Sequence, residues 1–229
     1  MSEFRLIDEN SVKIANEIMR KIVLSMNGEV SERMGILGME YRKNYGVAVP
    51  RLKEIAAGYP HDKLLAMELW NRKIRESMIM ATLLAPVDKF SRANALKWIG
   101  EIAGLEMAEQ LSMNLLSKLP FCGSLAVELT ASEKEWERII GFMTAVRIYV
   151  ELTDNEAGII VRNGFASDVE NSYFLAVSVA RSTGRMSRKG SAIASEIAGL
   201  LHEYEANTAG YRKLVVEEIK QELIFLNIL

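Results

Sequence analysis

The segment Leu-Ala-Met-Glu-Leu at residues 65–69 recurs as Leu-Ala-Val-Glu-Leu at residues 125–129, and each copy closes a predicted helix. A second predicted helix follows within a few residues, opening with Ile-Arg-Glu at 74–76 and with Trp-Glu-Arg at 136–138. Neither helix of such a pair can bury its apolar face alone, so successive pairs are expected to stack. The repeat therefore predicts a helical-repeat solenoid, a curved superhelix of α-α pairs. An irregular helical bundle with a coincidental repeat is the alternative.

The rest of the chain has the composition of an all-α protein. Ala, Leu, Met, Glu, Lys, Ile and Arg dominate, and the 4 prolines fall at the ends of apolar-periodic segments. Between residues 134 and 151 the apolar residues recur at helical spacing, and no alternating strand pattern of useful length competes. The expected helices cover residues 10–26, 32–43, 50–58, 61–72, 74–85, 88–101, 105–118, 122–131, 133–151, 154–164, 168–182, 187–204 and 208–226.

Composition also excludes several classes of protein. The 229 residues, 49% hydrophobic and 25% charged, are enough for one globular domain over residues 1–229. The single cysteine, Cys122, permits no intramolecular disulfide, and the two histidines, His61 and His202, provide little material for a metal site. We therefore expect no metal and no cofactor. Neither an apolar run of about 20 residues nor a signal pattern is present, so we expect a cytoplasmic protein without membrane contact.

The basic residues are the candidates for nucleic-acid binding. Because the net charge is −2, binding would depend on charge gathered on one face. One cluster has no intervening acid, and Gly184 and Gly190 predict a turn within it; its members are Arg181, Arg185, Arg188 and Lys189. Two further clusters are Arg72, Lys73 and Arg75, and Arg42, Lys43, Arg51 and Lys53.

In a solenoid, equivalent turns of successive repeats line one surface, so these clusters are expected to contact DNA phosphates along it. Such contacts predict binding to double-stranded DNA with little sequence specificity and a steep salt dependence. The alternative is that each cluster is a solvated helix end, where cations are also favoured.

Two further stretches carry a family resemblance. They are residues 45–56, Tyr-Gly-Val-Ala-Val-Pro-Arg-Leu-Lys-Glu-Ile-Ala, and residues 68–81, which include Glu-Leu-Trp and Arg-Glu-Ser-Met-Ile-Met-Ala. They resemble the bacterial DNA alkylation repair family of AlkD-like HEAT-repeat DNA glycosylases. The resemblance implies a HEAT-like solenoid around duplex DNA, nucleoid association when bound, and excision of N3- and N7-alkylated purines. From the residues themselves, Gly46 predicts a tight turn, Pro50 a helix start and Trp70 a core position.

The resemblance also assigns candidate catalytic residues. A Trp-Asp-x-x-Asp motif of the family falls on residues 105–109, where Glu106 and Glu109 keep the two acids and Leu105 replaces the tryptophan. A carboxylate there would stabilise the sugar cation that forms as the cationic base leaves. The alternative is that both acids simply favour a helix N-terminus. A Trp-x-Arg-Arg run matches residues 136–139, where Arg138 remains and Ile139 takes the other arginine position.

Three functions follow from these observations. The first is a DNA-binding HEAT-like repeat protein that hydrolyses the N-glycosidic bond of alkylated purines with Glu109 or Glu106 and with Arg138. The second is a non-catalytic member that binds distorted or branched DNA, because serine at 178, like leucine at 105, replaces an aromatic residue of the family. The third is a helical scaffold that binds another protein.

Overall fold

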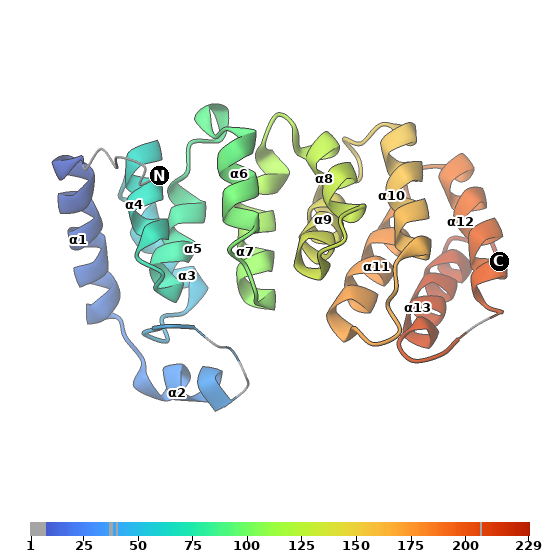
Figure 1. The fold of residues 1–229 in the computed structure, drawn as a ribbon, viewed down its shortest axis with the longest axis horizontal. Helices are drawn as coiled ribbons and strands as arrows, with labels where there is room; N and C mark the ends of the chain where they lie inside the picture. The colour runs from blue at the N-terminus through green and yellow to red at the C-terminus, as the bar shows by residue number, and fades with distance from the viewer. Residues whose placement is uncertain (1–7, 37–38, 40, 207) are drawn as a thin grey trace. The chain divides into compact units, whose positions relative to one another are not determined.

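The computed structural model describes residues 8–36, 39, 41–206 and 208–229. Within them the chain forms α-helices and two short 3-10 helices, and no strand (Figure 1). The α-helices are α1 Glu9–Leu24, α2 Gly28–Ile36, α3 Val49–Ala56, α4 Lys63–Asn71, α5 Arg75–Leu84, α6 Arg92–Ile99, α7 Leu105–Asn114, α8 Cys122–Thr130, α9 Glu135–Ile148, α10 Asp154–Ala166, α11 Tyr173–Met186, α12 Ser191–Tyr204 and α13 Arg212–Phe225. The all-α prediction is confirmed.

Several predicted helix boundaries are wrong: the helices expected over 88–101, 168–182, 187–204 and 208–226 span 92–99, 173–186, 191–204 and 212–225, and the one expected over 105–118 ends at 114. The helix expected over 32–43 begins earlier, at Gly28, where the Asn27 side chain accepts a hydrogen bond from the N–H of Val30 at 3.1 Å; residues 37, 38 and 40 of that prediction lie outside the described residues. The turn predicted at Gly184 does not exist, because α11 continues to Met186. A Cβ at Gly184 would lie 3.6 Å from Glu222 of α13, so helix packing decides this glycine's role.

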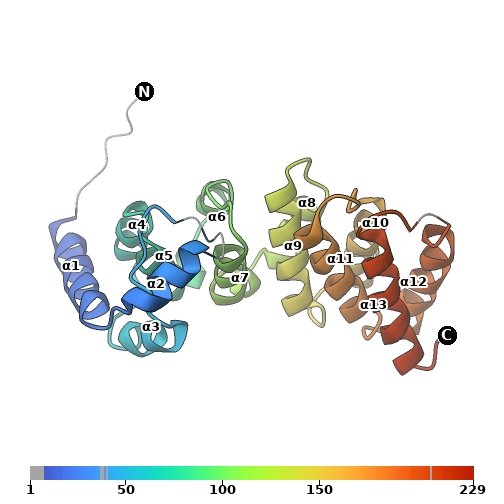
Figure 2. The same cartoon turned by 90° about the horizontal axis from the view of Figure 1, so that it is seen from below.

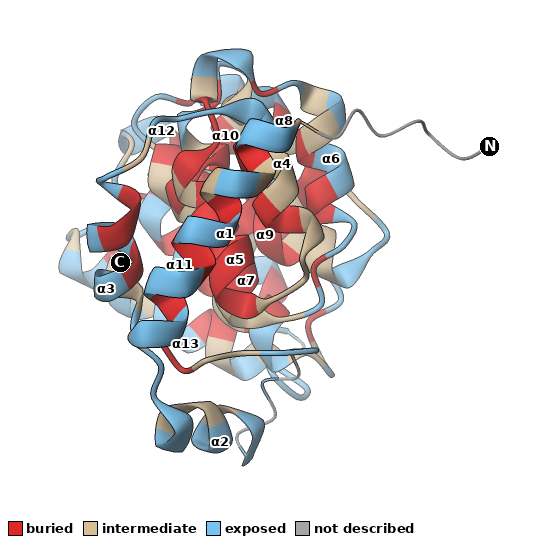
Figure 3. Cartoon of the chain, turned by 90° about the vertical axis from the view of Figure 1, so that its left-hand side faces the viewer, coloured by how far each residue is buried: buried red, intermediate tan, exposed pale blue. Residues whose placement is uncertain are grey.

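The chain divides into two compact units, residues 1–94 and 95–229, and α6 contains the division. In the first unit α1 packs on α3 and α4, and α5 packs on α3 and α4. Figure 3 colours α5 as buried. The buried residues of this helix include its arginine and its first-turn glutamate as well as its apolar residues. Trp70, at the end of α4, is fully buried, which confirms the predicted core position.

The loop before α3 is held by a buried ion pair. Gly46 has φ +67°, and a Cβ there would lie 2.2 Å from the backbone oxygen of Asn27, so only glycine fits without a shift. The carboxylate of Glu76 accepts hydrogen bonds from the N–H groups of Tyr45 (3.0 Å) and Val47 (3.2 Å). Arg75 donates to the same carboxylate at 2.9 Å and to the Val47 carbonyl at 2.9 Å. The loop and the first turn of α5 therefore form one hydrogen-bonded unit.

The segment between Asn27 and Tyr45, which carries α2, begins and ends at the same place in the first unit. The N–H of Asn27 donates to the carbonyl of Tyr45 at 2.8 Å, which ties the two ends together. No residue of α2 is buried. This helix therefore adds nothing to the core of the unit.

In the second unit the helices form two layers, which can be followed from green (α7) to red (α13) in Figures 1 and 2. In one layer α8, α10 and α12 pack side by side, and in the other α7, α9, α11 and α13 do so. Each of α8, α10 and α12 packs on the helix that follows it in the chain. Gly141 of α9 allows the closest approach: a Cβ there would lie 2.8 Å from the Cβ of Leu129 and from the N–H nitrogen of Thr130, both in α8.

The sequence repeat occupies the same place in both units. Residues 65–69 lie in α4, which packs on α5, and residues 125–129 lie in α8, which packs on α9. In both copies the first leucine, the alanine and the last leucine are buried. The repeat thus marks equivalent helix pairs, as predicted. Among the described residues, no helix is long and apolar enough to cross a membrane.

Candidate nucleic-acid interface

The layer of α7, α9, α11 and α13 has one side that is not covered by other helices of its unit; we call this side the open face. It is clearest on α11, where the exposed residues follow one stripe. At about 100° per residue, they fall within a sector roughly 120° wide. This stripe, the α11 stripe, consists of Tyr173, Phe174, Arg181, Arg185 and, just past the helix end, Arg188.

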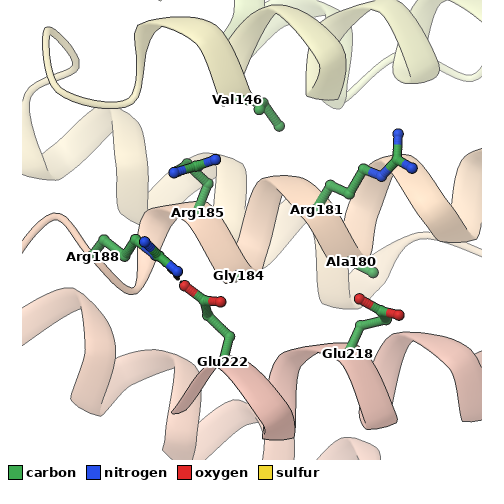
Figure 4. Close-up of a pocket in the computed structure, with 8 residues that line it drawn as sticks. All are labelled: Val146, Ala180, Arg181, Gly184, Arg185, Arg188, Glu218 and Glu222. Atoms are coloured by element: carbon green, nitrogen blue, oxygen red, sulfur yellow. Dashed lines mark hydrogen bonds and ion pairs between the residues drawn. The ribbon is translucent and has the colours of Figure 1, made fainter. Parts of the chain in front are cut away.

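A pocket of about 290 Å³ lies on the open face, between α9, α11 and α13 (Figure 4). Its charged lining consists of Arg181, Arg185, Arg188, Glu218 and Glu222. The two glutamates come from α13, far from the arginines in sequence. The cluster that has no acid in the sequence therefore does have acids beside it in space.

Arg188 is paired within the protein. Its Nε donates to Glu222, as Figure 4 shows, and its guanidinium lies 5.5 Å from the centre of the Phe225 ring. The hydrogen bond to Glu222, together with that carboxylate's charge, raises the pKa of Arg188 above its ordinary value. A phosphate approaching Arg188 would therefore compete with Glu222.

Arg181 and Arg185 are the available cations of the pocket. Both are exposed, and neither makes a hydrogen bond or an ion pair with any residue that the structure describes. The guanidinium of Arg185 lies 5.5 Å from the centre of the Tyr149 ring, which orients it by a cation–π contact. Their guanidinium groups retain all their N–H donors for an anionic ligand.

Lys189, unlike Arg181 and Arg185, contacts polar groups within the protein. Its side chain is only 10% exposed, and its Nζ lies 3.4 Å from the carbonyl oxygen of Val150 and 3.9 Å from the carboxylate of Asp154. The lysine therefore ties the end of α11 to the connection between α9 and α10. We leave Lys189 out of the proposed DNA-contacting set.

The candidate catalytic acids lie on the exposed side of α7. Glu106 and Glu109 are both half-buried and one turn apart, so they share this side. Glu109 faces Arg147 of α9, a residue that the sequence analysis missed. Burial lowers the pKa of the Arg147 guanidinium, and the charge of Glu109 opposes that shift. The Nη1 of Arg147 also donates to the carbonyl of Met143 at 2.7 Å, which holds the side chain in place.

Arg138 does not lie on the same side of α9 as Arg147. It precedes Arg147 on α9 by about two and a half turns, so the two side chains leave opposite sides of the helix. Its Nε is buried and has no hydrogen-bond partner among the described residues. Ile139, the other position matched to the family's arginine, is completely buried. Helical spacing counted from Trp136, three turns before Arg147, was the signal that could have found Arg147.

Neither of the two positions at which the family carries aromatic residues has an aromatic side chain in this protein. Leu105 is the first residue of α7 and is half-buried. Ser178 is buried in α11, and its hydroxyl donates to the carbonyl of Phe174 at 2.8 Å. No group of three or more His, Cys, Asp or Glu side chains suited to a metal ion occurs in the described part of the chain.

In the first unit, Arg51 and Lys53 are exposed on α3. Arg51 donates to Ser25 at 3.2 Å and to Glu54 at 2.8 Å, both at the surface. Such surface contacts are weak and are readily exchanged for a ligand. Both residues are therefore free to meet a phosphate.

The other basic cluster of the first unit is mostly engaged. Arg72 is half-buried and donates to Glu68 at 3.2 Å and to Asn16 at 2.9 Å. Lys73, at φ +55°, lies 5.2 Å from the centre of the Trp70 ring. Arg75, at 1% exposure, belongs to the buried ion pair with Glu76 and cannot reach DNA. We leave Arg75 out of the proposed contacts.

Comparison with known proteins agrees with this fold. A family model of the DNA alkylation repair enzymes matches residues 18–167. The chain belongs to the DNA alkylation repair family. A solved structure described as "A new family of proteins related to the HEAT-like repeat DNA glycosylases with affinity for branched DNA structures" is similar, with a TM-score of 0.71, 14% identity and 82% of each chain covered. Its fold confirms the predicted HEAT-like repeat. Among curated proteins, none matches.

Proposed function

We propose that this member of the DNA alkylation repair family binds DNA through the open face, with Arg181 and Arg185 of the α11 stripe on the phosphate backbone. The observation that carries the proposal is the pair of exposed guanidinium groups of Arg181 and Arg185, which have no intramolecular ion pair within the described residues. Planar guanidinium groups suit phosphate recognition. Contacts to phosphate carry no sequence information, so the binding depends on DNA shape.

Distorted or branched DNA is the substrate class we favour. Branched DNA is bound by the structural relative, according to its description. This chain also has no aromatic residue at 105 or 178, where the family's glycosylases use aromatic residues on the lesion. Loss of those residues favours recognition of DNA shape over excision of one base.

The test compares Arg181→Gln/Arg185→Gln with Arg162→Gln/Lys118→Gln, which removes the same charge outside the α11 stripe. Binding of a four-way junction and of a matched duplex would be measured by fluorescence anisotropy over a salt series. The first variant should bind more weakly and lower the slope of log K against log salt by about 1.8, since each lost phosphate contact contributes about 0.9. The control should bind like the wild type.

Equal behaviour of the two variants would contradict the proposed interface. If the wild-type protein has no DNA affinity even at low salt, the helical scaffold that binds another protein becomes the better hypothesis.

A second candidate function, excision of alkylated purines, is supported by the Glu109–Arg147 arrangement. These groups come from neighbouring helices and lie on the open face. A carboxylate there, beside the positive charge of Arg147, can stabilise the cationic sugar as an alkylated base leaves.

Release of N7-methylguanine from methylated duplex DNA tests this function. Wild-type protein should release the base, Glu109→Gln should not, and Glu128→Gln on α8, outside the open face, should release it normally. No release by the wild type above background would remove the excision hypothesis and leave DNA binding standing.

A further inference from the structure

Four aromatic side chains form a row across the second unit. Trp136 lies 6.2 Å from Phe174, Phe174 lies 5.8 Å from Tyr173, and Tyr173 lies 5.5 Å from Tyr211, between ring centres. They come from the beginnings of α9, α11 and α13, which are neighbours in one layer. We call these four residues the aromatic row.

The aromatic row is not part of the core. Tyr173, Phe174 and Tyr211 are 50%, 42% and 41% exposed, and Trp136 is half-buried. Adjacent rings are inclined at 32° to 64°, so no pair is stacked face to face. Exposed aromatic surface of this extent is unfavourable in water unless it has a ligand. The row therefore has ring surface available for stacking.

The row is continuous with the proposed phosphate contacts. Tyr173 and Phe174 occupy one end of the α11 stripe, and Arg181 follows about two turns later, roughly 10 Å along the helix. A strand whose phosphates contact Arg181 and Arg185 therefore has the aromatic row beside its next nucleotides. Proteins that bind single strands combine cationic grooves with aromatic rings in this way.

A carboxylate beside the aromatic row favours a neutral base over a phosphate at this site. Glu135, exposed at the start of α9, accepts a hydrogen bond from the Ser172 hydroxyl at 2.9 Å, next to Tyr173. Its negative charge repels a phosphate but not a neutral base. Bases inside a duplex do not expose their faces, so only unpaired bases can stack here.

We infer that the aromatic row binds unpaired nucleobases of a single-stranded arm or branch point by stacking. The inference rests on the proposed function, because it places the bases next to backbone contacts on the α11 stripe. It also supplies a physical reason for a preference for branched over continuous duplex DNA.

Tryptophan fluorescence gives a direct readout. The chain has 3 tryptophans, and Trp70 and Trp98 are completely buried. Quenching by a nucleic acid therefore reports on Trp136. Titration with an oligothymidylate single strand should quench the wild-type emission, whereas a blunt duplex should not, and Trp136→Phe should lose the response.

Affinity measurements separate stacking from backbone binding. Tyr173→Leu/Phe174→Leu keeps apolar side chains but removes the rings, and should weaken binding of a forked DNA by about tenfold or more. Its affinity for blunt duplex should stay within about twofold of wild type. Thermal unfolding of the variant verifies that the fold is intact.

The outcomes distinguish a failure of the stacking site from a failure of the proposed backbone interface. Equal loss for fork and duplex, unchanged fork binding, or no quenching by the single strand would overturn the stacking site. If Arg181→Gln/Arg185→Gln binds DNA like the wild type while the single strand still quenches Trp136, the proposed backbone interface fails and the stacking site stands. A wild type that binds neither DNA form overturns both.

Discussion

At the scale of single residues, the motif that carries the family resemblance has a structural role. Gly46 turns the chain where no Cβ fits, and Glu76 binds the N–H groups on both sides of it. Arg75 neutralises that carboxylate inside the protein. A sequence motif conspicuous enough to indicate the family can thus be explained by loop geometry alone, without any contact to DNA.

This arrangement predicts a large loss of stability on substitution of Glu76. Glu76→Ala leaves the guanidinium of Arg75 buried without its carboxylate and frees two backbone N–H groups, so unfolding should become easier by about 3–5 kcal/mol. Urea denaturation measures the change. The double variant Arg75→Met/Glu76→Met should cost less than the sum of the two single variants; simple additivity would argue against the pair.

At the scale of helices, the sequence predicts elements well and partners poorly. The helices were predictable because apolar periodicity and prolines are local signals. The end of α11 was not, because Gly184 resembles a helix break until α13 packs against it. Local spacing can place Arg147 on the same side of α9 as Trp136, but it cannot show which residue of another helix lies opposite. The pairing of Arg188 with Glu222 and the electrostatic influence of Glu109 on Arg147 both connect different helices, so neither pairing was predictable.

Two glycines in helix interiors, one at a close helix contact and one in open space, are predicted to respond in opposite ways to substitution by alanine. Gly141→Ala places a methyl group 2.8 Å from α8 and should destabilise the protein by about 1–3 kcal/mol. Gly199→Ala, in the interior of α12 with nothing within 4 Å of the new Cβ, should stabilise it by about 0.5–1 kcal/mol.

Thermal unfolding of both variants under one set of conditions would measure these effects. A stable Gly141→Ala variant would mean that α8 and α9 can separate without cost, contrary to the packing described.

At the scale of the whole molecule, the net charge of −2 conceals an uneven distribution. The open face brings together arginines of α9 and α11 with glutamates of α7 and α13. The clustering of basic residues in the sequence located the arginines of α11, but it gave no indication of the acids of α13 beside them. Knowing which helices share a layer was necessary to see that these acids limit the positive potential of the pocket.

Because glutamates lie beside the arginines of the open face, removing one of these acids should strengthen DNA binding. Glu222→Gln frees Arg188 for a phosphate, so junction affinity at low salt should rise and the salt slope should become steeper by about 0.9. Anisotropy titrations over a salt series would measure both quantities. Glu217→Gln, which changes the same charge at an exposed position outside the pocket lining, is the control. Weaker binding by Glu222→Gln would show that Glu222 supports the interface.

The hydrogen bond between Asn27 and Tyr45 has a practical consequence for protein engineering. It joins the two ends of the segment that carries α2, and no residue of α2 is buried, so α2 itself can be exchanged while residues 41–45 are kept. Those residues must stay because the carbonyl of Lys43 accepts a hydrogen bond from the N–H of Arg75 at the start of α5. A peptide tag or a small reporter domain inserted in α2 would leave the core of the first unit intact.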